Sequence, residues 1–435
     1  MPAPVADVAM PTAPSGRGGP GRGAAATGAA FWTVTDVGLL LAVLVASSDM
    51  LVQLSPLGPL VWLLCYGLTL VRIAMTFPWF LSLMMRNVVV LAFPAACLAS
   101  VLWSMAPSDT LRAGVQLTMT VLIASYLGWR WSVTLILKCM VGVLSVGVVL
   151  SLVHWATGIF PWPVYTNAGG LAGFFSHKNM LGQRALFCVV AIVAIWLMRP
   201  REAGPGFKAL ATLSFGAMLA ALGLAESMTS VLLAPAFMGL MLLVTVHRVP
   251  PGLAFWLGGA VLVTAALGPV MLAVGGVDPV GAVLGAVGKD ATLTGRTLLW
   301  DIAADIVAGH PVLGVGYAAF WAAPEFANAR LQVFYAGATA PSFHNFVWEI
   351  RVAAGWPALL SMLALLAVAV ARLWRLWRGA GTVAAAAGLV LVAAIVATSL
   401  VGASLYRQHE FMIVLLVMLC VSAGEELRRL RVRAD

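Results

Sequence analysis

Three short polar stretches interrupt a sequence that is otherwise largely apolar, and each holds residue types that could do chemistry. The stretch 342–351 reads Ser-Phe-His-Asn-Phe-Val-Trp-Glu-Ile-Arg. If it is helical from His344 onward, that histidine, Trp348 and Arg351 lie on one helix face. A histidine near a carboxylate can accept a proton close to neutral pH. His344 could therefore act as a general base, and a structural histidine is the alternative.

The second stretch, 173–184, contains Lys178 and Arg184 where a long apolar run begins. A charged side chain inside a membrane costs several kcal/mol unless it reaches the surface or faces a cavity. Lys178 could be an anchor that reaches the membrane surface, or it could contact a substrate. Arg184 lies more than one helical turn deeper, so we expect it to contact an anion inside a cavity.

The third stretch, 294–300, reads Thr-Gly-Arg-Thr-Leu-Leu-Trp and opens an apolar periodic segment. An arginine near a helix N-terminus has the wrong sign for the helix dipole. Arg296 becomes favourable if an anion binds there, because the guanidinium and the free backbone N–H groups then converge on it. An exposed surface arginine is the alternative.

Other catalytic patterns are absent from the sequence. It has no HExxH, Walker loop or GxSxG motif, and its expected outer loops hold no paired Asp-x-Asp for a divalent ion. The five cysteines lie inside apolar runs and read as packing residues. We therefore expect a reaction led by arginine and histidine that uses no metal and no cofactor.

The elements that must position these residues are membrane helices. Of 435 residues, 62% are hydrophobic and 9% are charged, whereas soluble domains carry roughly 25% charged residues. A spanning helix needs about 20 apolar residues, which predicts an all-α bundle of about twelve spans. They lie near 34–51, 57–77, 86–105, 110–128, 132–157, 179–198, 208–224, 229–246, 252–275, 354–371, 382–401 and 410–424.

The distribution of charge predicts the orientation of these spans. The net charge of +9 comes from short basic clusters between apolar runs, which argues against nucleic-acid binding. With basic clusters inside, the chain spans a bacterial inner membrane with both termini cytoplasmic. The expected parts are a disordered cytoplasmic leader (1–30), nine spans (31–275), a large periplasmic loop with the site (276–350), three more spans (351–424) and a basic cytoplasmic tail (425–435).

The expected periplasmic loop contains one predicted helix. Apolar residues recur at helical spacing after Arg296, while Asp301 and Asp305 form a polar face. Gly309 and Pro311 are predicted to end this helix. The apolar positions are Leu298, Leu299, Ile302 and Ile306.

Five segments together resemble a known family. They are Leu-Trp-Ser-Met-Ala-Pro (102–107), Phe-Phe-Ser-His-Lys-Asn-Met-Leu-Gly (174–182), Thr-Gly-Arg-Thr-Leu-Leu-Trp (294–300), His-Pro-Val-Leu-Gly-Val-Gly (310–316) and His-Asn-Phe (344–346). In this order they are similar to the O-antigen ligase and polysaccharide-polymerase family, particularly its exopolysaccharide-production branch. The resemblance covers roughly residues 100–360.

The resemblance implies a metal-independent glycosyltransferase that acts on the periplasmic side. Its donor is a glycan on undecaprenyl diphosphate, its acceptor is a hydroxyl of another glycan or of lipid A-core, and its partners include membrane lipid and other polysaccharide-assembly proteins. By motif match, His344 and Arg296 are the catalytic residues. The expected substrate-binding residues are Arg184, Lys178, His177, Asn345 and Arg351.

One position departs from the family pattern, and several functions stay open. Family members often carry a glutamate before the glycine at position 355, where this chain has Ala354; Glu349 could take that role. Polymerase and ligase use the same chemistry, and we favour the polymerase. A flippase or transporter of lipid-linked glycan and a non-catalytic scaffold are alternatives from other classes.

Overall fold

The computed structural model describes residues 22–167, 169–246, 296–335, 342–402 and 405–434, and these ranges form helices and no β-strand. The α-helices are α1 Arg22–Ser47, α2 Leu57–Met75, α3 Phe77–Arg86, α4 Val89–Ala99, α5 Pro107–Arg130, α6 Val133–Thr157, α7 Lys178–Leu197, α8 Pro200–Ala203, α9 Pro205–Ala225, α10 Met228–Val246, α13 Arg296–Gly309, α14 Ala319–Ala322, α15 Ala327–Tyr335, α16 Phe346–Ala380, α17 Val383–Ser399 and α18 Phe411–Ala434. Three 3-10 helices are η1 Val52–Leu54, η2 Ser100–Trp103 and η4 Pro324–Phe326.

The predicted class, an all-α membrane protein, is confirmed, but the count of about twelve spans is not. Among the described residues, six helices are long and apolar enough to cross a membrane, namely α2, α6, α7, α9, α10 and α16. A seventh candidate is the pair formed by α3 and the segment 89–103, which is bent by 88°. The apolar parts of α1 and α17 are shorter. The predicted span 252–275 lies outside the described residues.

Both chain ends differ from the predicted boundaries. Residues 1–21 of the expected leader lie outside the described part of the chain, and α1 begins at Arg22, within that leader. The alanines at the start of α1 favour helix, which explains the early start. The expected tail continues α18 without a break to Ala434. Arg431 and Arg433 occupy its last turn, where positive charge stabilises the helix dipole.

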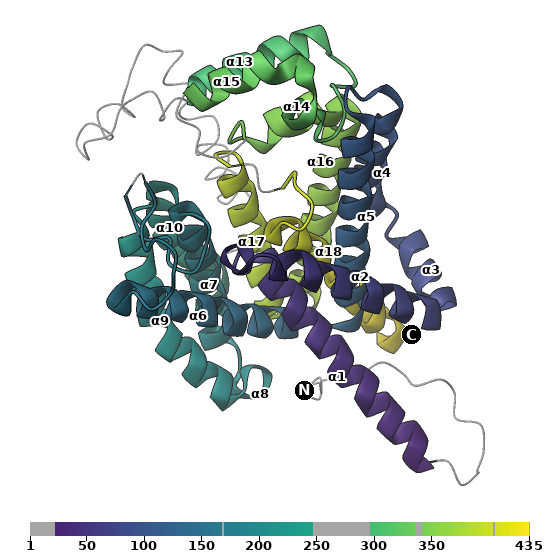
Figure 1. Cartoon of the computed structure of the whole chain (residues 1–435). Coiled ribbons are helices and arrows are strands. Elements are labelled where there is room, and N and C mark those ends of the chain that lie inside the picture. Colours follow the sequence, from purple (N-terminus) through teal and green to yellow (C-terminus); the bar gives the residue numbers. More distant parts are fainter. Residues whose placement is uncertain (1–21, 168, 247–295, 336–341, 403–404, 435) are drawn as a thin grey trace.

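The helices form two packed groups that α17 connects. In one group α16 packs against α4 and α18, and α5 packs against α4 and α18. In the other group α7 packs against α6, α9 and α10, and α17 contacts α7, α10 and α16. Helices α13 and α15 lie together at one end of the bundle, and α13 rests on α16 (Figure 1).

The long helix α16 is broken near its N-terminal end. Ala354 and Gly355 leave helical geometry, and Gly355 has a φ of 66°. A Cβ atom on Gly355 would overlap the carbonyl of Val312, so only glycine fits there. The break exposes the carbonyls of Val352 and Ala353, which would be costly in a membrane if they stayed unpaired.

The segment 310–316 fills this break. The Val315 N–H donates to the Val352 carbonyl at 2.8 Å, and the Gly316 N–H donates to the Ala353 carbonyl at 2.8 Å. In return, the Trp356 N–H donates to the Val312 carbonyl at 2.9 Å. The backbone groups freed by the break are therefore paired with a segment about forty residues earlier in the chain.

The same segment is also held by residues from the end of η2 to the first turn of α5. The Trp103 indole donates to the Leu313 carbonyl at 3.1 Å, and the Met105 N–H donates to the Val315 carbonyl at 3.0 Å. The Thr110 hydroxyl donates to the Tyr317 carbonyl at 2.7 Å. Two of the five sequence segments, 102–107 and 310–316, thus form one scaffold around the N-terminal end of α16.

Candidate functional site

His344 occupies a left-handed turn directly before α16. Its φ is 52°, and its N–H donates to the Ser342 hydroxyl oxygen at 2.8 Å. Asn345 caps the helix, because its side-chain oxygen accepts the Val347 N–H at 2.9 Å. The helix therefore begins at Phe346, and the helical face expected to join His344 with Trp348 and Arg351 does not form. The cap forces an extended Asn345 and leaves His344 outside the helix.

The turn is tied to α13 and to the interior of α16. The Trp300 indole of α13 donates to the Phe343 carbonyl at 3.0 Å. The Phe343 N–H donates to the Glu349 carboxylate at 2.8 Å. The stretches that contain Arg296 and His344 are therefore in contact through Trp300 and Phe343. Arg296 is the first residue of α13, and its side chain lies outside the described part.

The predicted helix in the expected outer loop is confirmed as α13, which ends at Gly309. Leu299 and Ile302 are buried, and Asp301 and Asp305 are exposed, as expected. Leu298 is different, because its side chain is 47% exposed and so does not belong to the buried face.

The stretch around Lys178 is held by the turn between α1 and α2. The Ser176 N–H and hydroxyl donate to the Asp49 carboxylate at 2.8 and 2.5 Å. His177 caps α7, because its Nδ1 accepts the Asn179 N–H at 3.2 Å. Burial, with a smaller effect from the Lys178 charge, lowers the pKa of His177. Lys178 is half-buried at the first position of α7.

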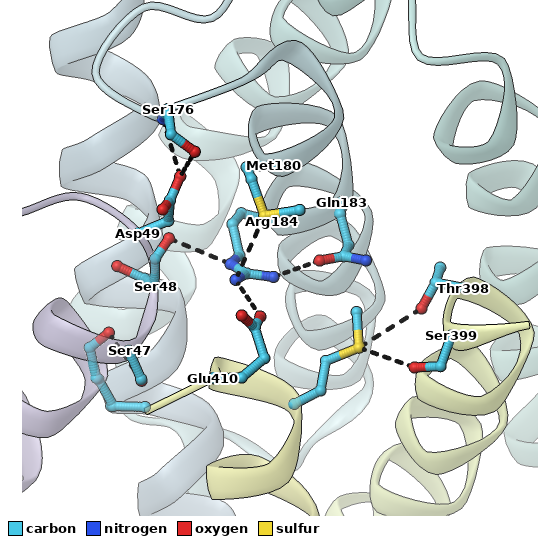
Figure 2. A network of polar contacts seen from close by, with 12 residues as sticks. Ser47, Ser48, Asp49, Ser176, Met180, Gln183, Arg184, Thr398, Ser399 and Glu410 are labelled. Carbon is cyan, nitrogen blue, oxygen red and sulfur yellow. Dashed lines mark hydrogen bonds and ion pairs between the residues drawn. The ribbon is translucent and has the colours of Figure 1, made fainter. Parts of the chain in front are cut away.

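Arg184 lies completely buried in α7 and faces a set of protein acceptors (Figure 2). Its Nη2 donates to the Glu410 carboxylate at 2.8 Å, and its Nε donates to the Ser48 carbonyl at 3.2 Å. Its Nη1 donates to the Gln183 side-chain oxygen, and the guanidinium lies 4.8 Å above the Phe411 ring. Arg184 thus contacts an anion, but that anion is a carboxylate of the protein itself.

Residues 405–410, between α17 and α18, were not singled out from the sequence. Besides the contact of Glu410 with Arg184, these residues contact Tyr317, which directly follows the segment 310–316. The Tyr317 hydroxyl donates to the Tyr406 carbonyl and to the Gln408 side chain, both at 3.0 Å. Arg407 interacts electrostatically with Glu349. A run of five polar residues between two apolar helices was the available signal. The segment links the Arg184 cluster to the helix that follows His344.

His409 in this segment has a packed environment. Its ring stacks on Trp62 with 4.2 Å between the ring centroids, and its Nε2 hydrogen-bonds the Tyr66 hydroxyl. Its N–H donates to the Thr120 hydroxyl oxygen at 3.2 Å. Burial lowers the pKa of His409 to about 4. The imidazole is therefore neutral near pH 7.

The remaining predicted contact, Arg351, points toward the scaffold segment. Its guanidinium donates to the Pro311 carbonyl at 3.0 Å and lies 4.0 Å above the Trp356 ring. The neighbouring segment lines a cavity of about 360 Å³ whose wall also includes Trp103 and His310. In the described part of the chain, no three His, Cys, Asp or Glu residues gather as a metal-binding group.

Comparison with known proteins agrees with the resemblance. Residues 213–363 match the family model described as O-antigen ligase. The chain is 30% identical over 272 residues to the exopolysaccharide production protein ExoQ of Rhizobium meliloti (strain 1021). That match covers 61% of this chain and spans 60% of the relative's length. Together, the two matches show that parts of this membrane protein are similar to the O-antigen ligase family and to an exopolysaccharide production protein.

Proposed function

We propose that this protein is a membrane glycosyltransferase that polymerises exopolysaccharide or O-antigen repeat units. It transfers a glycan from undecaprenyl diphosphate to a hydroxyl of an acceptor glycan on the periplasmic side of the inner membrane. The observation that carries this proposal is the family match over 213–363, which contains both α13 and the His344 turn. The similarity to an exopolysaccharide production protein favours the polymerase.

In the proposed reaction, His344 is the general base. Its imidazole accepts the proton of the acceptor hydroxyl while that oxygen attacks the anomeric carbon of the donor sugar. The bond between that carbon and the diphosphate oxygen breaks, and undecaprenyl diphosphate leaves with the electron pair. A positioned general base contributes about 10²–10⁴ in rate. The diphosphate is a good leaving group, so the reaction needs no nucleotide.

Positive charge near the leaving diphosphate completes the proposal. Arg296 opens α13, where the free N–H groups of a helix start favour an anion. Arg184 can reach the diphosphate only if one of its acceptors gives way. Its strongest acceptor, the Glu410 carboxylate, keeps 19% of its side chain exposed and is the partner that substrate could replace. Further proposed substrate contacts are Lys178, His177, Asn345 and Arg351.

The test compares purified wild-type protein with His344→Ala in lipid nanodiscs. The donor is the lipid-linked glycan extracted from cells that lack this gene. We expect His344→Ala to lose about 10²–10⁴ in transfer rate and to keep its donor affinity, because a general base acts mainly in the transition state. Transfer by the wild type is expected to persist in excess chelator.

The matched control is His409→Phe, which keeps an aromatic ring against Trp62 and is expected to transfer glycan normally. Normal transfer by folded His344→Ala would contradict the general base. No transfer by the wild type would favour the flippase or the scaffold instead.

A ligase is the second candidate, because the matching family model is described as O-antigen ligase. The two activities differ only in the acceptor. Supplying donor alone tests for the polymerase, which lengthens the lipid-linked glycan. Supplying donor with lipid A-core tests for the ligase, which moves the glycan onto that acceptor. The product formed by the purified protein distinguishes them.

A further inference from the structure

We infer that Glu349 is a positioning residue that fixes the His344 turn through hydrogen bonds to the two residues before it. This inference rests on the proposed function, since it matters for catalysis only if His344 does. The Glu349 carboxylate accepts the Phe343 N–H at 2.8 Å and the Trp321 indole N–H at 3.4 Å. It also accepts a hydrogen bond from the Ser342 hydroxyl.

The Ser342 hydroxyl passes this constraint on to His344. Its oxygen accepts the His344 N–H at 2.8 Å while its hydrogen serves Glu349. One carboxylate therefore restrains Ser342 and Phe343 directly and His344 through a single hydroxyl. Such a restraint is needed because a left-handed conformation is unfavourable for a non-glycine residue. The φ of 52° at His344 persists only because its surroundings hold it.

The surroundings of Glu349 suit a restraint better than direct chemistry. The residue is 1% exposed, and its oxygens receive donors from the protein. A buried carboxylate needs compensation by charge and hydrogen bonds, and Arg407 supplies a positive charge in electrostatic reach. On the other side of the turn, the Trp300 indole holds the Phe343 carbonyl. Both polar groups of the Phe343 backbone are thus fixed before the chain reaches His344.

The experiment is a double-mutant cycle between Glu349 and His344 in the nanodisc assay. We expect Glu349→Ala to lower the turnover of donor by about 10², the size of effect that a 1 Å misplacement produces. Donor affinity and the number of donor molecules bound per protein are expected to stay at wild-type values. Glu349→Gln is expected to lose less, because its amide oxygen can still accept the Phe343 N–H.

Coupling between the two residues is the decisive measurement. If Glu349 acts through His344, adding Glu349→Ala to His344→Ala removes little further activity, whereas independent effects multiply. Ser342→Ala provides a second route if Glu349→Ala does not fold, since it removes only the hydroxyl that relays the restraint. It is expected to reduce turnover and to couple with His344→Ala in the same way.

The control variant is Glu426→Ala at the other end of the bundle. Glu426 also accepts a backbone N–H at 2.8 Å, from Val133, and so matches the loss of one such bond. Its turnover per folded protein is expected to equal that of the wild type. Wild-type turnover by folded Glu349→Ala and Ser342→Ala, or multiplicative losses in the double variants, would overturn the inference. Neither result touches the proposed function, which fails if the wild type transfers no glycan, whereas normal transfer by His344→Ala contradicts the general base.

Discussion

Two turns of this protein have the same backbone conformation at a histidine but different contacts around it. His344 precedes Asn345 and the start of α16, and His409 precedes Glu410 and the start of α18. Both histidines have a left-handed backbone conformation, with φ values of 52° and 65°. In each case one polar residue follows the histidine, and the helix then begins at a phenylalanine.

The neighbours of the two rings differ. The His409 ring is held directly, by stacking on Trp62 and by the Tyr66 hydroxyl. At His344 the described hydrogen bonds hold the backbone, through Ser342 and through Glu349 at the preceding residue. The polar residues also differ, since Asn345 caps its own helix while Glu410 binds Arg184. The comparison teaches that one backbone conformation can place a histidine among quite different partners.

The largest effect on stability is expected at the Arg184–Glu410 pair. Arg184→Ala leaves the Glu410 carboxylate and several acceptors unpaired inside the protein, and removing one partner of a buried ion pair costs about 3–5 kcal/mol. Thermal unfolding in detergent measures this loss. Arg112→Ala is the control, because the Arg112–Asp109 pair is exposed and such pairs contribute about 0–1 kcal/mol. A folded Arg184→Ala protein with wild-type stability would contradict this expectation and would mean that the Arg184–Glu410 pair does not stabilise the fold.

A smaller effect is expected from acid at the His409 turn. The pKa of His409 is lowered to about 4, so the unfolded chain binds a proton more readily than the folded one. Stability from this group is complete above about pH 6.5 and is lost as the pH falls toward 4, by up to about 3 kcal/mol. Unfolding temperatures of the wild type and His409→Phe between pH 7 and pH 4.5 test this. Equal slopes for the two proteins would contradict it.

The smallest effect is expected at the cap of α16. Asn345→Ala removes the acceptor of the Val347 N–H and is expected to cost about 1 kcal/mol. Asn345→Asp keeps an acceptor at the helix start and is expected to retain most of the stability. Thermal unfolding again provides the measurement. Equal losses in the two variants would mean that Asn345 acts through contacts other than capping.

The sequence predicted the class of fold and the approximate position of most helices, because apolar length and charge are local properties. It also placed the end of α13 at Gly309, where glycine and the following proline disfavour helix. The start of α16 was missed, since the Asn345 cap competes with the helical spacing of Trp348 and Arg351. Tertiary partners were harder to predict, because helices such as α13 and α16 pack together although other segments separate them in the sequence (Figure 1).

The candidate site was predicted only in part for the same reason. The stretches with Arg296 and His344 meet through Trp300 and Phe343. The partner of Arg184 is 226 residues away, in a segment with no recognisable motif. No periodicity or local spacing relates two residues at that separation, so the pairing of Arg184 with Glu410 could be found only from the folded chain.

The break in α16 has a consequence for how this sequence can vary in length. The N–H groups of Val315, Gly316 and Trp356 each meet one particular carbonyl across the break. Adding or deleting a residue between Val312 and Gly316 would shift these pairs out of step and leave polar backbone uncovered. The two segments that pair across the break, although far apart in the gene, must therefore keep their lengths matched. Insertions and deletions are tolerated only outside them.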